Sequence, residues 1–127
     1  LKGVLSADDA VRVRDAGVDA VYVSNHGGRQ LDAAPAAIDV LPEIRQAVGV
    51  DYPLIFDSGI RSGEGIVKAL ALGADFVMLG RPFLYASSAD GRRGVYHLVD
   101  LLKNDMLLVL AQIGCTDVSL LDKSVLA

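Results

Sequence analysis

The chain has 127 residues, of which 52% are hydrophobic and 22% charged, and its net charge is -4. This composition is typical of a folded domain with a substantial core, and the length allows one modest domain. The charges are mixed along the chain and form no basic stripe, so we expect no nucleic-acid partner. No apolar stretch approaches the ~20 residues that a membrane-spanning helix needs. The single cysteine, Cys115, is interpreted as a small buried thiol in a reducing compartment.

Strand and helix patterns alternate along the chain. Leu1 is interpreted as the tail of a first strand, and further strands are predicted over residues 20–23, 53–56 and 76–79. Helices are predicted over residues 7–16, 36–48 and 63–72, with Ser6 and Ser62 as N-caps and glycines as C-terminal stops. The strands show little polar alternation, as expected for strands buried on both faces of a parallel sheet.

A long amphipathic helix is predicted from residue 94 to about residue 113, ended by Gly114. Leu107, Leu108 and Leu110 fall partly off its apolar stripe, which indicates either a wide core face or a subunit contact. His97 is interpreted as a surface residue of this helix.

Polar or glycine-rich residues follow all four predicted strands, at Lys2-Gly3, residues 24–29, residues 57–61 and Gly80-Arg81. A barrel builds its active site from several strand ends, whereas a doubly wound sheet concentrates it at one switch point. The pattern therefore favours a (β/α)8 TIM barrel. Such a barrel needs about 250 residues and eight strands. We predict an α/β half-barrel of about four βα units plus a C-terminal helix, whose partner half lies elsewhere.

The first candidate site is Ser24-Asn25-His26-Gly27-Gly28-Arg29. Its two glycines permit a tight turn after the strand. A neutral imidazole at His26 can accept a proton near pH 7, and the Arg29 guanidinium can hold a carboxylate through two hydrogen bonds. This pair suits a substrate with a hydroxyl beside a carboxylate.

The next two strand ends indicate a ligand with a phosphate and a hydroxylated chain. In Asp57-Ser58-Gly59-Ile60-Arg61, the aspartate can accept hydrogen bonds from hydroxyls, Gly59 permits close backbone approach, and Arg61 can meet a phosphate. Gly80 and Arg81, with Pro82 opening a short helix, form an anion site of the kind found at helix N-termini. Lys2 could stabilise an anionic ring. No metal site is expected.

These motifs resemble the FMN-dependent 2-hydroxy-acid oxidase and dehydrogenase family, which includes glycolate oxidase and (S)-mandelate dehydrogenase. The resemblance covers nearly the whole chain, and its matching segments are residues 1–5, 24–32, 57–61, 68–74 and 79–82. It implies that residues 1–127 are the C-terminal half of the barrel. It also implies that this segment alone is inactive and does not hold FMN stably, because the other half supplies the Asp that orients the base.

The resemblance implies that His26 is the base, which removes either the hydroxyl proton or the α-proton, and that Arg29 anchors the substrate carboxylate. Lys2 would lie beside the flavin N1–C2=O edge, Ser24 would contact the flavin, and Asp57 would bind the ribityl chain. The remaining ribityl and phosphate contacts would come from Arg61, Gly80, Arg81 and the backbone of Ser58, Gly59 and Ile60.

The implied reaction oxidises an (S)-2-hydroxy acid of the lactate, mandelate or glycolate type to the 2-oxo acid. The implied electron acceptor is O2, a quinone or a cytochrome. A homotetramer in the cytoplasm or on the inner face of the membrane is expected. Within the family, residues 57–61, with Ser58, look closer to the bacterial lactate and mandelate dehydrogenases, and residues 110–115 resemble the mandelate enzymes. The alternatives are an IMP dehydrogenase-like or isopentenyl diphosphate isomerase-like barrel, and an inactive half-barrel.

Overall fold

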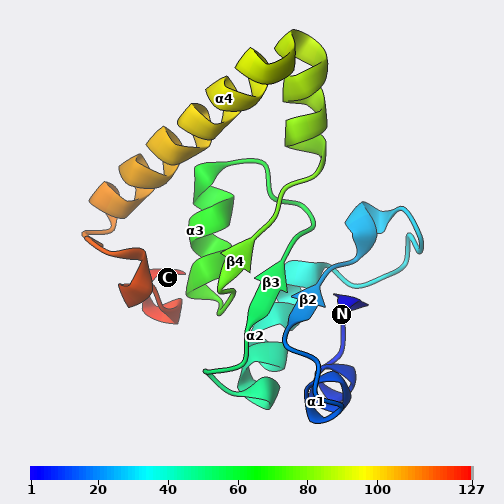
Figure 1. The fold of residues 1–127 in the computed structure, drawn as a ribbon. Coiled ribbons are helices and arrows are strands. Elements are labelled where there is room, and N and C mark those ends of the chain that lie inside the picture. Colours follow the sequence, from blue (N-terminus) through cyan, green and yellow to red (C-terminus); the bar gives the residue numbers. More distant parts are fainter. Residues whose placement is uncertain (127) are drawn as a thin grey trace.

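The computed structural model describes residues 1–126, in which strands and helices alternate (Figure 1). The elements in chain order are β1 (Lys2–Val4), α1 (Ala7–Asp15), β2 (Val21–Val23), the 3-10 helix η1 (His26–Gly28), α2 (Ala37–Val48), β3 (Leu54–Phe56), α3 (Gly63–Ala71), β4 (Phe76–Val77), α4 (Arg81–Gln112) and the 3-10 helices η2 (Val118–Leu120) and η3 (Lys123–Leu126).

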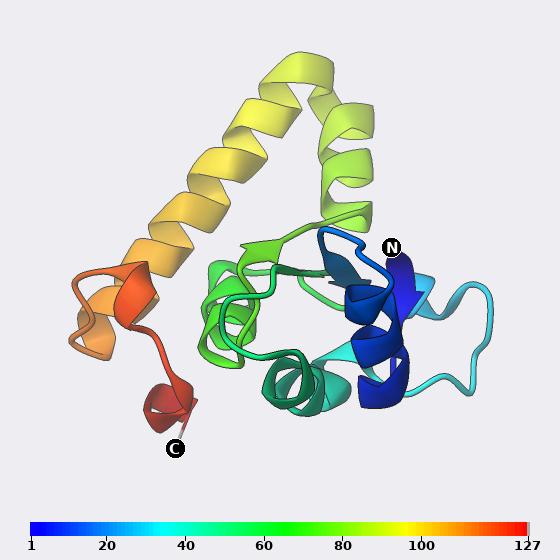
Figure 2. The same cartoon turned by 60° about the horizontal axis from the view of Figure 1, so that its bottom comes forward.

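The four strands form one parallel sheet in the order β1-β2-β3-β4. Helices α1, α2 and α3 lie along one side of this sheet (Figure 2). A doubly wound sheet reverses its strand order and carries helices on both faces, whereas a barrel wall keeps sequential order with its helices outside. The predicted parallel α/β fold is confirmed, and its winding is that of a barrel wall.

The core lies between the sheet and the helices. Strand residues Val21, Val23, Leu54 and Phe56 are fully buried there, together with residues of α1 and α2. Because side chains alternate along a strand, Tyr22 on β2 and Ile55 on β3 point to the opposite face, which is only half-buried. Within residues 1–126 the strands are therefore buried on one face, and not on both faces as expected.

Both predicted N-caps are confirmed. The Ser6 side chain accepts a hydrogen bond from the Asp9 backbone N–H at 3.2 Å, and the Ser62 side chain accepts one from Gly65 at 3.1 Å. Each bond satisfies a backbone donor that the first helical turn leaves free. Ser62 directly follows Arg61, so the cap fixes where α3 begins relative to the predicted site.

The second leg of α4 is the long helix that was predicted over residues 94–113, and it ends at Gln112. The first leg begins at Arg81 and is the short helix predicted to open at Pro82, and a break at Asp90 and Gly91, where Gly91 has a φ of +48°, separates the two legs. The second leg folds back so closely that a Cβ on Gly94 would lie 2.0 Å from the carbonyl oxygen of Ala86. The break thus turns the chain between two helical legs, and glycine at position 94 lets them pack closely.

Several smaller expectations also change. Lys2 lies within β1 and not after it, and β4 ends at Val77, which leaves Met78 and Leu79 outside the strand.

Cys115 is half-buried, with Sγ 3.1 Å from the carbonyl oxygen of Asp117. On α4, Leu110 is buried, whereas Leu107 and Leu108 are exposed. His97 is exposed, as predicted.

Candidate active site

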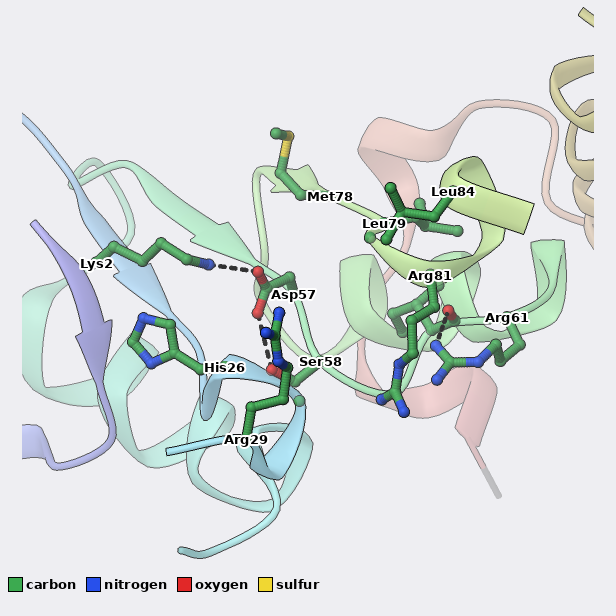
Figure 3. Close-up of a pocket in the computed structure, with 14 residues that line it drawn as sticks. Lys2, His26, Arg29, Asp57, Ser58, Arg61, Met78, Leu79, Arg81 and Leu84 are labelled. Carbon is green, nitrogen blue, oxygen red and sulfur yellow. Dashed lines mark hydrogen bonds and ion pairs between the residues drawn. The ribbon is translucent and has the colours of Figure 1, made fainter. Parts of the chain in front are cut away.

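A cavity of about 220 Å³ lies at the carboxyl ends of the strands (Figure 3). Lys2 and His26 border it on one side, Arg61 and Arg81 border it on the other, and Asp57 lies between them. The complete lining is Lys2, His26, Gly27, Arg29, Asp57, Ser58, Gly59, Ile60, Arg61, Met78, Leu79, Gly80, Arg81 and Leu84. Strand ends that are far apart in sequence therefore meet in one site.

An ion pair between Lys2 and Asp57 lies at the centre of the polar contacts. Lys2 Nζ lies 2.5 Å from Asp57 Oδ2 and donates a second hydrogen bond to Ser24 Oγ at 3.1 Å. The Tyr22 hydroxyl donates to the same Oδ2 atom at 2.9 Å. On the other carboxylate oxygen, Oδ1, Asp57 accepts a hydrogen bond from Ser58 Oγ at 2.8 Å.

This arrangement favours the charged form of Asp57. Burial opposes ionisation of the carboxyl group, but hydrogen bonds from Lys2, Ser24, Ser58 and Tyr22 outweigh it and lower the pKa of Asp57 below its usual value. Burial is also the main reason why the pKa of Tyr22 is raised, and the Asp57 carboxylate raises it further. At neutral pH the site therefore holds an ionised Asp57 and a protonated Tyr22.

The loop after β2 presents His26 to the cavity. His26 has a φ of +54° and its backbone N–H donates to Ser24 Oγ at 3.1 Å, while the Asn25 side chain accepts from Gly27 N–H at 2.9 Å. Within residues 1–126 neither ring nitrogen of His26 has a hydrogen-bond partner. An imidazole held by its backbone with free ring nitrogens can accept a proton from a bound ligand.

The loop after β3 is tied to the loop after β2. Ser58 has a φ of +86°, a conformation that favours glycine, and its Oγ accepts a hydrogen bond from the Asn25 backbone N–H at 3.1 Å. The same hydroxyl donates to Asp57 in its own loop. The Ser58 side chain therefore connects the loop after β2 with the Asp57 carboxylate.

Three arginines give the cavity its positive charge. Arg29, Arg61 and Arg81 form no ion pair with any carboxylate in the described part of the chain. With Lys2 they place four cationic side chains against the single carboxylate of Asp57, although the whole chain carries a net charge of -4. Helices α3 and α4 begin beside Arg61 and Arg81, and helix N-termini also favour anions. The donor set fits a ligand with a carboxylate and a phosphate.

The structure brings nearly all of the predicted site residues together. Ten of the eleven line the cavity, and the exception is Ser24, which is fully buried beneath Lys2 and the His26 backbone. A fully buried Ser24 supports the site from below and has no surface facing the cavity.

Sequence reasoning missed the apolar wall formed by Met78, Leu79 and Leu84, and it also missed Tyr22. Met78 and Leu79 directly precede Gly80. A strand prediction that ended at Val77 would have placed them in the loop that forms the site. The one signal for Tyr22 is that it is the only residue with a hydroxyl among residues 20–23, but its pairing with Lys2 depends on strand register.

The cavity places cations and helix N-termini at the carboxyl ends of parallel strands, an arrangement typical of α/β enzymes of the barrel type that bind phosphorylated ligands. The model of the FMN-dependent dehydrogenase family matches residues 1–127, the whole chain. The chain therefore belongs to this family of FMN-dependent 2-hydroxy-acid oxidoreductases.

Individual relatives agree with this assignment. The chain is 48% identical to L-lactate oxidase of Lactobacillus jensenii over 93% of the chain and 29% of that protein. It is 46% identical to L-lactate dehydrogenase of Caulobacter sp. (strain K31) over 100% of the chain and 33% of that protein. The chain thus spans about a third of the length of the curated relatives it matches.

Solved structures match as well. The structure of the monotopic membrane protein (S)-mandelate dehydrogenase superposes with a TM-score of 0.93 at 50% identity, covering 97% of the chain and 32% of that protein. The predicted family, the partial-barrel fold and the family's dependence on FMN are therefore confirmed. No helix within residues 1–126 is long and apolar enough to cross a membrane.

Proposed function

We propose that the protein containing this chain oxidises an (S)-2-hydroxy acid of the lactate, mandelate or glycolate type to the corresponding 2-oxo acid. One observation carries the proposal: His26, with free ring nitrogens, shares a cavity with three arginines that have no ion-pair partner among residues 1–126. Relatives named lactate oxidase and 2-hydroxyacid oxidase support it. Family membership favours this chemistry over the IMP dehydrogenase-like and isopentenyl diphosphate isomerase-like alternatives.

His26 and Arg29 would handle the substrate. The Arg29 guanidinium would hold the carboxylate through paired hydrogen bonds and so present the α-carbon to the cavity. Oxidation to the 2-oxo acid removes two electrons and two protons, one proton from the hydroxyl oxygen and one from the α-carbon. His26 would accept one of these protons, and the other would pass with the two electrons to FMN. Bound FMN would supply the two-electron acceptor.

The other cavity residues would hold the cofactor, and the donor set fits it. Arg61, Arg81 and the backbone at Gly80 would bind the phosphate, because they combine guanidinium charge with a helix N-terminus. Asp57 and the backbone of residues 58–60 would bind the ribityl hydroxyls. Lys2 would oppose the negative charge of the reduced ring.

The partners and the location extend the same proposal. The electron acceptor would be O2, a quinone or a cytochrome, the assembly would be a homotetramer, and the other half of the barrel would complete the site. We place the protein in the cytoplasm or on the inner face of the membrane. One structural neighbour is described as a monotopic membrane protein, which is compatible with the second location.

Anaerobic flavin reduction in the full-length protein tests the proposal. L-lactate, (S)-mandelate and glycolate are added in turn, and loss of the oxidised flavin absorbance is followed. At least one of them should reduce the flavin. His26→Gln should retain FMN but slow reduction about 10²–10⁴-fold, because it lacks the base. Arg29→Met should chiefly raise KM.

The matched control is His97→Gln, which alters the chain's other histidine on the exposed surface of α4 and should reduce at the wild-type rate. If no 2-hydroxy acid reduces the flavin, or if His26→Gln reduces as fast as His97→Gln, the proposal is wrong. Reduction of a nicotinamide by IMP would instead support the IMP dehydrogenase-like alternative.

A further inference from the structure

Tyr22 lies at the middle of β2, on the side of the sheet opposite the helices. Its sequence neighbours Val21 and Val23 are fully buried in the core, so strand alternation directs the Tyr22 side chain to the other face. In the parallel pairing of β1 and β2, Tyr22 stands opposite Lys2. The phenol is therefore placed beside the central ion pair by the backbone itself.

Tyr22 contacts both members of that ion pair. Its hydroxyl donates to Asp57 Oδ2 at 2.9 Å, and Lys2 Nζ lies 3.6 Å from the centroid of its ring. An ammonium over a tyrosine ring at this distance is attracted to the negative face of the ring. Lys2 is thus held by Asp57, by Ser24 and by the aromatic face together.

We propose that Tyr22 is a positioning residue that keeps Asp57 partnered while Lys2 turns its charge toward an anionic ligand. Asp57 Oδ2 accepts hydrogen bonds from Lys2 and Tyr22 at once, so the phenol remains on this oxygen when the ammonium shifts. The inference rests on the proposed function, because there the ligand is the reduced, negatively charged flavin.

The chemistry of the phenol suits this role. Burial and the nearby carboxylate raise the pKa of Tyr22, so the hydroxyl stays protonated and remains a donor throughout the neutral range. Without it, Lys2 would be the strongest partner left for Asp57 Oδ2. A carboxylate with fewer donors binds an ammonium more tightly and neutralises more of its charge. The positive potential that Lys2 offers to the cavity would then fall.

Tyr22→Phe removes the hydroxyl and keeps the ring. The matched control is Tyr52→Phe, because the Tyr52 hydroxyl is also half-buried and donates to the Val18 carbonyl oxygen at 2.6 Å, among residues that do not line the cavity. Both variants lose one phenolic hydrogen bond. A loss of stability that both variants share is therefore attributed to the lost hydrogen bond and not to the role of Tyr22 beside Lys2.

The first measurement needs no flavin. Carbon-13 NMR of labelled aspartate follows the titration of Asp57 in the flavin-free protein. Tyr22→Phe should raise the pKa of Asp57, because it removes a hydrogen bond to the charged form, while Tyr52→Phe should leave it unchanged. If Tyr22→Phe leaves the Asp57 pKa at the wild-type value, the inference is overturned.

The second measurement is the midpoint potential of bound FMN in the full-length protein. Tyr22→Phe should lower the preference for reduced over oxidised FMN about three- to tenfold, which for a two-electron couple is about 15–30 mV. Tyr52→Phe should keep the wild-type potential. An unchanged potential in Tyr22→Phe overturns the role toward flavin. If the wild-type protein binds no FMN, the proposed function fails, while the aspartate titration still decides the role of Tyr22.

Discussion

Gly3 gives the His26 imidazole its place beside β1. A Cβ at Gly3 would lie 2.9 Å from His26 Cε1, closer than carbon atoms approach without displacement, and Gly3 has a φ of +96°. Hydrogen in place of a side chain thus serves two purposes at one position: it permits the backbone conformation and it leaves room for the ring. The Lys2-Gly3 pair acts as a unit, in which Lys2 supplies charge and Gly3 supplies space.

Replacing Gly3 with alanine should therefore harm both stability and catalysis. We expect Gly3→Ala to lower the free energy of unfolding by about 1–2 kcal/mol, from the positive φ alone, and to slow flavin reduction at least about tenfold by displacing His26. The control is Gly17→Ala at the joint between α1 and β2, where φ is +81° and an added Cβ meets nothing within 4 Å. Denaturant unfolding and reduction rates of both variants make the comparison. A wild-type reduction rate in Gly3→Ala would show that His26 tolerates the displacement.

At the residue scale, the sequence identifies the chemical groups but not how they contact one another. His26, Arg29, Arg61 and Arg81 follow strands in sequence, and placement at a strand end is enough to predict a shared cavity. Tyr22 belongs to the same network through the strand register of β1 and β2, which no local pattern encodes. Contacts between side chains on neighbouring strands therefore depend on strand register and cannot be predicted from a local sequence pattern.

At the element scale, the two near-identical joints Gly17-Val18-Asp19 and Gly73-Ala74-Asp75 share a backbone but not their contacts. Both glycines have positive φ, at +81° and +107°, as a helix end followed by a strand requires. Only the second joint is clamped by Arg45, which bonds the Gly73 carbonyl oxygen at 2.8 Å and the Asp75 carboxylate at 2.5 Å. The repeat predicts the turn, whereas the clamp depends on an arginine contributed by α2.

The start of α3 is held by the second leg of α4. Asp105 Oδ2 accepts a hydrogen bond from the Gly63 backbone N–H at 2.6 Å, so a side chain from α4 caps α3 in addition to Ser62. A Cβ at Gly63 would lie 2.3 Å from the Met106 backbone nitrogen. The two helices thus cross in direct backbone contact beside Arg61, a crossing that the amphipathic pattern of α4 does not reveal.

Two alanine substitutions in the same helix should have opposite effects. Gly63→Ala should destabilise the chain by about 1–3 kcal/mol or more, because backbone atoms of α4 cannot move aside. Gly65→Ala should stabilise it by up to about 1 kcal/mol, because its Cβ would meet Ile60 and Ser62 at ordinary distances of 3.5 Å and alanine favours the helix. Thermal and denaturant unfolding measure both. Equal effects of the two substitutions would argue against the close crossing.

At the scale of the whole molecule, the alternating pattern of elements was enough to predict a parallel α/β fold. Glycine stops and serine caps located each predicted helix to within about two residues, but they did not show that the chain reverses at Asp90 and Gly91, between the two legs of α4. The pattern could not show that one face of the sheet is only half-buried, because Tyr22 and Ile55 are as suited to a buried face as their neighbours are.

The distribution of charge in the cavity predicts how the 127-residue chain by itself binds FMN. Its cavity of about 220 Å³ is smaller than the ~300–1,000 Å³ of typical ligand sites, and Arg61 and Arg81 lie at one side of it. We expect weak FMN binding dominated by the phosphate. Riboflavin, which lacks the phosphate, should bind at least about tenfold more weakly, since hydrogen bonds to charged groups contribute about 1.5–3 kcal/mol. Salt should weaken FMN binding and scarcely affect riboflavin.

Fluorescence titration of the chain with each flavin measures these affinities. Arg61→Gln should bring the affinity for FMN close to that for riboflavin. The control Arg92→Gln, which alters an exposed arginine beside Tyr96 on α4, should leave both affinities unchanged. Equal binding of the two flavins by the wild-type chain would contradict a phosphate site at Arg61 and Arg81. Stoichiometric FMN retained through gel filtration would instead contradict the weakness of binding, and would mean that this third of the relatives' length already forms most of the flavin site.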